Sequence, residues 1–208
     1  MSHYGFDFRA TSGFVADAAG NSPVLGESYP NVYSNGLTAG YELGGDVITR
    51  DRDNTYDARL AGTNYCSNGG VQQSFRIDLP VSGLYTISLA SGDISYSSTE
   101  YISIYDNSSL LSILLNGAVA GLNSFYDAAG NNYYPGPNWV AGQQAVNLTF
   151  STTIARIYIG NASGSSTINF IGLDTSYAPW TAVTSKDFSK FPIKQIRDKT
   201  KIIWNPYK

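Results

Sequence analysis

The most densely charged stretch of the chain is ITRDRDNTYDAR at residues 48–59, and it is the first candidate for chemistry. Its aspartates have the alternate spacing of oxygen ligands for calcium: Asp51, Asp53 and Asp57. The stretch lacks the glycine and the closing glutamate of a helix-loop-helix calcium loop, and it also contains three arginines: Arg50, Arg52 and Arg59. Since these cations offset the field that a divalent ion needs, we expect a network of Arg–Asp ion pairs, with a looser calcium site as the alternative.

Few residues could support catalysis. The single histidine, His3, is far in sequence from Ser95 in the stretch SGDIS, which resembles a displaced nucleophile motif. A serine nucleophile needs a histidine base, so this stretch is better interpreted as a turn at the end of a strand. Cys66 is the only cysteine, which excludes an internal disulfide and a cysteine zinc site. We predict that the chain is not an enzyme and has no cofactor, calcium excepted.

An aromatic loop at residues 123–142 is the candidate site for a glycan. A long loop inside a compact domain is often functional, and this one is rich in rings that could stack on sugars. The candidate stacking residues are Tyr126, Tyr133, Tyr134 and Trp139. The alternative is that these rings pack locally or against a neighbouring subunit, because tyrosine and tryptophan are also enriched at interfaces.

These side chains must be positioned by strands. Apolar residues alternate with polar ones, between Gly, Pro, Asn and Asp turns, in three segments that each predict a hairpin: 74–93, 99–117 and 145–161. Residues 4–9, 37–43 and 166–174 add further strands, and no helix pattern exceeds about two turns. The sequence predicts an all-β protein, an antiparallel sandwich or barrel.

Several strand and turn signatures resemble a known fold. They are Gly5-Phe6-Asp7-Phe8, Phe75-Arg76-Ile77-Asp78-Leu79-Pro80, Gly83-Leu84-Tyr85-Thr86-Ile87, Gly92-Asp93, Leu148-Thr149-Phe150-Ser151 and Ile168-Asn169-Phe170-Ile171. Together they resemble the galactose-binding-like jelly-roll β-sandwich of malectin-like and carbohydrate-binding modules, which accompanies pectin-degrading enzymes. The resemblance implies a fold that often binds glycans, at times with a structural calcium ion. The same sandwich is also used in virion proteins of bacteriophages.

The C-terminal part has a different composition from the body. We divide the chain into a sandwich at residues 1–176 and an extended arm at 177–208. The arm carries seven basic and two acidic residues, a net charge of +5, whereas the rest of the chain has a net charge of −8. Apolar residues alternate with the basic ones, which predicts an arm that docks on an acidic partner. The docking candidates are Lys190, Phe191, Lys194, Ile196, Arg197, Lys199, Lys201 and Trp204.

These observations favour a non-catalytic structural protein. The N-terminus has no signal-peptide pattern, no apolar run could span a membrane, and an acidic body argues against nucleic acid. We predict a bacteriophage virion component, a capsid decoration or tail-fibre protein assembled in the host cytoplasm. Its arm would dock on other virion subunits with an acidic surface, as a homo-oligomer or bound to the lattice, and its sandwich could contact glycans. The alternatives are a carbohydrate-binding module, and a carbohydrate-active hydrolase or esterase accessory domain.

Overall fold

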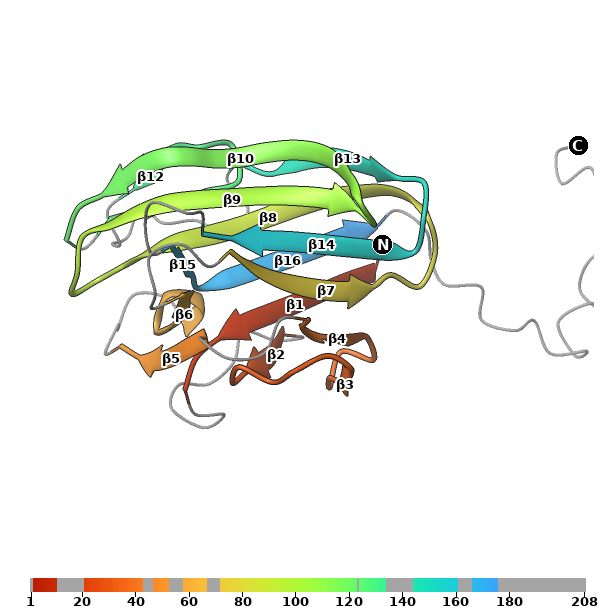
Figure 1. Ribbon diagram of the computed structural model, residues 1–208, viewed down its shortest axis with the longest axis horizontal. Coiled ribbons are helices and arrows are strands. Elements are labelled where there is room, and N and C mark those ends of the chain that lie inside the picture. Colours follow the sequence, from red (N-terminus) through yellow and green to blue (C-terminus); the bar gives the residue numbers. More distant parts are fainter. Residues whose placement is uncertain are drawn as a thin grey trace, which may run out of the picture. The chain divides into compact units, whose positions relative to one another are not determined.

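The described part of the protein consists of strands joined by turns (Figure 1). The computed structural model describes residues 2–10, 21–42, 47–52, 58–66, 72–122, 124–133, 144–160 and 166–175. One short 3-10 helix, Ala58–Leu60, is the only helical element among them. No helix in these ranges is long and apolar enough to cross a membrane. The predicted arm, residues 177–208, lies outside the described residues.

One layer of the sandwich is a seven-stranded sheet. Its central strand β8 (Gly83–Asp93) has β16 (Phe170–Thr175) on one edge, and β1 (Ser2–Phe8) and β2 (Asn21–Val24) follow in order. Three strands lie on the other edge of β8: β13 (Val146–Phe150) along its first half, β11 (Ser124–Tyr126) along its second half, and β12 (Asn132–Tyr133) outside β11. All of these ladders are antiparallel except the one between β1 and β2, which is parallel.

The second layer is a six-stranded sheet, and a small third sheet accompanies the two. The order of the six strands is β10 (Ser109–Ala120), β9 (Ser98–Asp106), β14 (Ile154–Ile159), β7 (Gln73–Asp78), β4 (Thr38–Tyr41) and β3 (Asn31–Val32). The small sheet has the order β15 (Thr167–Ile168), β6 (Gly62–Cys66) and β5 (Val47–Asp51). The prediction of an all-β, antiparallel β-sandwich is confirmed.

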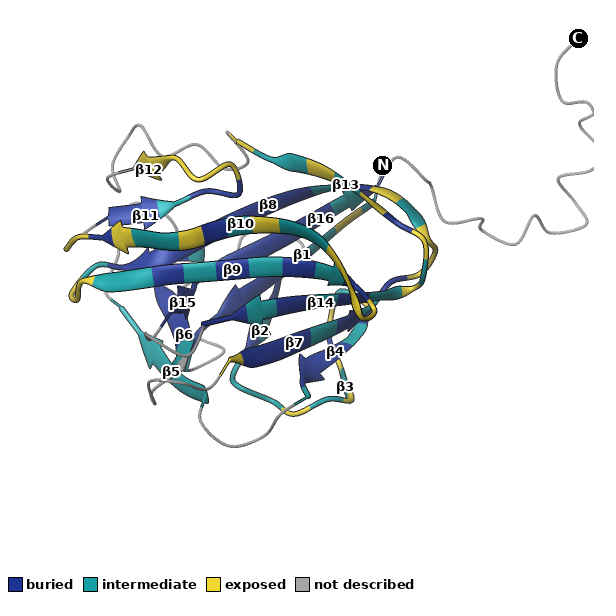
Figure 2. Ribbon diagram, turned by 45° about the horizontal axis from the view of Figure 1, so that its top comes forward, coloured by how far each residue is buried: buried dark blue, intermediate teal, exposed yellow. Residues whose placement is uncertain are grey.

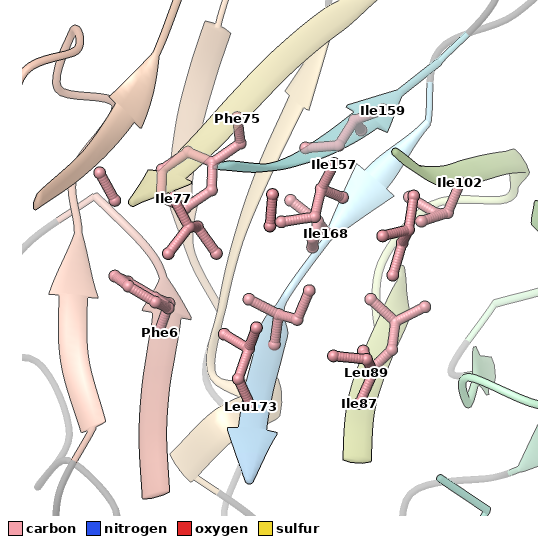
Figure 3. Close-up of a cluster of buried hydrophobic side chains, with 14 of the residues drawn as sticks. Phe6, Phe75, Ile77, Ile87, Leu89, Ile102, Ile157, Ile159, Ile168 and Leu173 are labelled. Atoms are coloured by element: carbon pink, nitrogen blue, oxygen red, sulfur yellow. The ribbon is translucent and has the colours of Figure 1, made fainter. Parts of the chain in front are cut away.

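The core lies between the two large sheets (Figure 3). Successive side chains of a strand point to opposite faces, so alternate residues of each strand reach the core. Phe75, Ile157 and Ile102 come from the six-stranded sheet and point toward Phe6 and Leu173 of the other sheet. Figure 2 shows the same alternation along β9, where buried and partly exposed residues follow one another.

Two of the three predicted hairpins are wrong. Residues 99–117 do form one, since β9 and β10 pair with each other. Strands β7 and β8, however, pair with other strands in different sheets, and so do β13 and β14. In both cases the short connection crosses from one layer of the sandwich to the other. The alternation of apolar residues is the same for a hairpin and for such a crossing, so it does not distinguish them.

Candidate functional site

The outer face of the six-stranded sheet carries a group of tyrosines. Ile102 and Ile104 of β9 point into the core, so the partly exposed residues on either side of them, Tyr101 and Tyr105, point outward. On the neighbouring strand β14 the same alternation places Tyr158 on this outer face. The rings of Tyr105 and Tyr158 meet edge to face, with centroids 4.7 Å apart. The face therefore presents aromatic rings in a fixed arrangement.

A bidentate ion pair borders these rings. Arg156 of β14 donates from Nε and Nη2 to the two carboxylate oxygens of Glu42, at 2.7 and 2.8 Å, and also donates to the side-chain oxygen of Asn107. Ser74 donates its hydroxyl to Glu42 at 2.8 Å. Arg156 lies directly opposite Tyr105 in the ladder between β14 and β9. The charged pair and the tyrosines thus share one continuous surface.

A second charged pair extends this surface across β7. Arg76 lies opposite Arg156 in the ladder and donates to Asp78 at 2.9 Å, while its guanidinium carbon lies 4.3 Å from the ring centroid of Tyr29. The Tyr29 hydroxyl donates to the other carboxylate oxygen of Asp78 at 2.8 Å. Gly40, opposite Arg76 with φ of 145°, makes this possible, since a Cβ there would lie 2.6 Å from the Tyr29 backbone nitrogen.

The Arg156–Glu42 pair is held in its ionised form, and the two positive and two negative charges of this face offset one another. The hydrogen bonds from Arg156 lower the pKa of the Glu42 carboxyl, and Glu42 in turn raises the pKa of Arg156. The hydrogen bond to Asp78 raises the pKa of the Tyr29 hydroxyl, which keeps that hydroxyl a donor. We define the outer-face surface as the residues Tyr29, Glu42, Arg76, Asp78, Tyr101, Tyr105, Asn107, Arg156 and Tyr158. It combines apolar ring faces with oriented polar groups and little net charge.

The aromatic loop predicted as a glycan site is only partly described. Tyr126 lies in β11, packs partly against the core, and donates its hydroxyl to the Val119 carbonyl at 3.0 Å. Tyr133 lies in β12, where its backbone pairs with Phe125. Tyr134 and Trp139 lie outside the described residues. The structure thus brings Tyr126 and Tyr133 onto adjacent strands, and a stacking site in this loop stays a prediction.

The charged stretch at 48–59 forms its described ion pair with another strand. Arg52 makes a bidentate ion pair with Asp93 at the end of β8, with distances of 2.7 to 3.2 Å. Asp51 accepts a hydrogen bond from the Ala10 amide at 2.9 Å. Asp53 and Asp57 lie outside the described residues, so the calcium alternative stays a prediction. No group of three metal-ligating side chains occurs among the described residues.

The histidine is held by structural contacts. His3 Nδ1 lies 2.8 Å from the Asp174 carboxylate, and Nε2 lies 3.1 Å from the side-chain oxygen of Asn21. The Asn21 amide nitrogen donates to Asp7 at 3.1 Å, which fixes the orientation of the amide. Ser95 is not part of this group, because its amide hydrogen-bonds to Asp93 in the turn after β8. These contacts do not assemble the serine–histidine arrangement that acyl transfer needs.

The outer-face surface was not predicted, although part of its signal is in the sequence. The run Tyr101-Ile-Ser-Ile-Tyr105 alternates isoleucines, which face the core, with tyrosines on the side expected to face solvent. Partly exposed aromatic residues that gather on one face of a sheet make that face a candidate surface for a partner or ligand. The pairing of this strand with Arg156 and Glu42 could not be inferred from local patterns, because these two residues lie 114 positions apart.

Comparisons with known proteins give resemblances in structure alone. No protein-family model matches the chain, and no curated protein matches it in sequence. A carbohydrate-binding module of Cellvibrio mixtus lichenase 5A, solved in complex with cellotriose, is 11% identical with a TM-score of 0.40, covering 66% of this chain and 92% of that one. A family 35 carbohydrate-binding module from Paenibacillus barcinonensis is 10% identical with a TM-score of 0.38, covering 66% and 93%.

A larger protein is also similar. Bacteroides uniformis β-glucuronidase 2 is 20% identical with a TM-score of 0.43 over 84% of this chain, which spans only 18% of that enzyme's length. Carbohydrate-binding modules are also the class of domain that the strand and turn signatures of the sequence resemble. At these identities and TM-scores the likeness assigns no ligand to this chain.

Proposed function

We propose that the described β-sandwich is a non-catalytic glycan-binding domain that holds a sugar chain on its outer-face surface. The observation that carries the proposal is the group formed by Tyr105, Tyr158 and Arg156 on the adjacent strands β9 and β14, with Glu42 paired to Arg156. Ring faces can cover the apolar faces of sugars, while oriented guanidinium and carboxylate groups can hydrogen-bond to hydroxyls. Because the polar groups are already fixed by one another, little conformational entropy is lost on binding.

The same geometry argues against a hydrolase at this surface. A glycosidase needs one carboxyl with a raised pKa to act as the general acid. The hydrogen bonds from Arg156 instead lower the pKa of Glu42, and Asp78 is engaged by Arg76 and Tyr29. Both carboxylates are thus arranged as hydrogen-bond acceptors, which suits binding without bond cleavage.

A glycan array followed by calorimetry with the best ligand tests the proposal. We expect Tyr105→Ala and Tyr158→Ala each to weaken binding about tenfold, as removal of a central aromatic contact does. Leu84→Ala, a change at a residue 49% exposed on β8 of the other sheet, is the control and should leave binding unchanged.

Two further variants distinguish the outer-face surface from the predicted aromatic loop. If Trp139→Ala or Tyr126→Ala abolishes binding while both outer-face variants bind normally, the loop is the site and the proposal is wrong. If the array shows no glycan but the outer-face tyrosines are protected in a protein complex, the surface is a protein interface. Tyrosine is common at both kinds of site, so these measurements decide between them.

The virion assignment stays a prediction. Its main support in the sequence, the docking arm with Lys190, Phe191 and Trp204, lies outside the described residues. Three proposals therefore rest on the sequence alone: a virion location, an acidic protein partner and a homo-oligomer. They are compatible with glycan binding, since a domain exposed on a particle can also bind sugars.

A further inference from the structure

A second polar and aromatic group lies at the small sheet, apart from the outer-face surface. Arg50 of β5 is half-buried, and its Nη2 donates to the Tyr65 hydroxyl at 2.6 Å. The guanidinium carbon lies 5.0 Å from the ring centroid of Tyr65 and 5.8 Å from that of Tyr96. Tyr96, in the turn between β8 and β9, is 58% exposed. Two rings therefore frame one cation at the solvent boundary.

Arg50 differs from four other described arginines in its ion pairing. Arg9, Arg52, Arg76 and Arg156 each form an ion pair with a carboxylate. Among the ion pairs of the described residues, none involves Arg50. A guanidinium has five N–H donors, and the hydrogen bond to Tyr65 uses one of them. Within the described residues, Arg50 thus keeps both an unneutralised positive charge and donors for a further acceptor.

The neighbouring residue on the same side of the strand shows what this arrangement can hold. Arg52, two residues along the chain, also lies against the Tyr96 ring, with its guanidinium carbon 5.3 Å from the centroid. Its donors are occupied by both oxygens of Asp93. The planar fork of an arginine matches a pair of anionic oxygens, and the Asp93 carboxylate supplies such a pair inside the protein. Arg50 offers a guanidinium of the same kind that has the Tyr65 hydroxyl as a partner but no carboxylate partner among the described residues.

We infer that Arg50, framed by Tyr65 and Tyr96, is a subsite for the anionic group of an acidic sugar, a carboxylate or a sulfate ester. The inference rests on the proposed glycan-binding function and names the substrate class that would extend it. The exposed ring of Tyr96 would cover one face of the sugar, while Arg50 would receive its anion. Because the body of the protein carries a net negative charge, a localised cation of this kind would select the ligand's orientation and favour acidic over neutral sugars.

Titrations of the full, nitrogen-15-labelled chain with single sugars test this subsite directly. The probes are glucose, glucuronate and glucose 6-sulfate, and the readout is the Nε–H resonance of Arg50, assigned by its loss in Arg50→Lys. We expect glucuronate or glucose 6-sulfate to shift this resonance and glucose to leave it in place. Which of the two acids causes the shift then shows whether the subsite binds a carboxylate or a sulfate ester. Tyr96→Ala, a change at an exposed position, should weaken that response about tenfold.

The inference is wrong if neither acid shifts the Arg50 resonance, or if glucose shifts it equally. It is also wrong if Tyr96→Ala leaves the response intact in a protein with an unchanged fold. The result is separable from the proposed function. A shift at Arg50 without any effect of Tyr105→Ala on glycan binding would sustain the subsite and reject the outer-face surface. Glycan binding that depends on Tyr105, with no response at Arg50, would do the reverse.

Discussion

At the scale of single residues, Asp106 shows how one side chain fixes a crossing between the two sheets. It ends β9 and accepts hydrogen bonds from the backbone amides of Ser151 and Thr152, at 2.8 and 3.0 Å, and from both of their hydroxyls. These residues form the connection from β13 to β14. Burial opposes ionisation of Asp106, but the four hydrogen bonds outweigh it and lower its pKa from 3.8 to about 2. The carboxylate is therefore bound in its charged form.

Replacing this carboxylate should destabilise the protein in a pH-dependent manner. We expect Asp106→Asn to lower the free energy of unfolding by about 2 kcal/mol near neutral pH, because an amide cannot accept all four hydrogen bonds as an anion does. A lowered pKa stabilises the fold above the unfolded value near 4, and this contribution is lost as the pH falls toward 2. Urea unfolding of both proteins should show a difference in the free energy of unfolding that is constant above about pH 5 and shrinks below about pH 4. A difference that does not change with pH would contradict this assignment.

At the scale of elements, Phe75 connects the two layers. It lies in β7 of the six-stranded sheet and is fully buried. Its ring meets Phe6 and Phe8 of β1, in the other sheet, edge to face with centroids 5.6 and 5.1 Å apart. It also meets Tyr41 of β4 at 5.1 Å. One aromatic side chain thus fills the space between three strands.

Removal of this ring should leave a cavity between the sheets. We expect Phe75→Ala to lower the free energy of unfolding by about 3–5 kcal/mol, from lost burial and an incompletely closed cavity. The exposed Leu84, changed to alanine, should alter it by less than about 0.5 kcal/mol. Denaturant unfolding of the two variants measures both values. A similar cost at the two positions would mean that the layers are not joined through this ring.

The element scale also explains what the sequence could and could not predict. Alternation predicted strands in the segments of β7, β9 and β14 and the hairpin of β9 with β10, since both depend on neighbouring residues. The crossing from β7 to β8 depends on contacts that a local pattern does not contain. Leu79 is buried within it, and its amide donates to the carbonyl of Thr153, in the connection from β13 to β14, at 2.8 Å. The candidate site could not be predicted for the same reason. It forms where β4, β7, β14 and β9 lie side by side, and a local pattern does not give this order of strands.

At the scale of the whole molecule, the two kinds of cation are separated along the chain. All six basic residues before position 186 are arginines, and all six lysines lie at or after that position, together with Arg197. Several of those arginines pair bidentately or lie against aromatic rings in the sandwich, roles for which a planar guanidinium is suited. Lysine is a flexible point charge, better suited to long-range attraction than to a fixed contact. This division supports assigning the fold and its ligand sites to one part of the chain and attraction to a partner to the other.

Deleting residues 177–208 tests that division. The last described strand, β16, ends at Thr175, where it pairs with Ser2 of β1 and Tyr85 of β8, so the sheet is complete before the deletion. We expect the shortened chain to unfold within about 2 °C of the full chain, since every core residue of the described structure is kept. If the arm of net charge +5 docks on an acidic surface such as that of another copy, the full chain should self-associate at low salt and dissociate as salt screens the attraction. Sedimentation velocity of both chains at low and high salt measures this. A full chain that stays monomeric at every salt concentration would exclude a second copy of the chain as the partner. A large decrease in the melting temperature of the shortened chain would show that the arm is part of the fold.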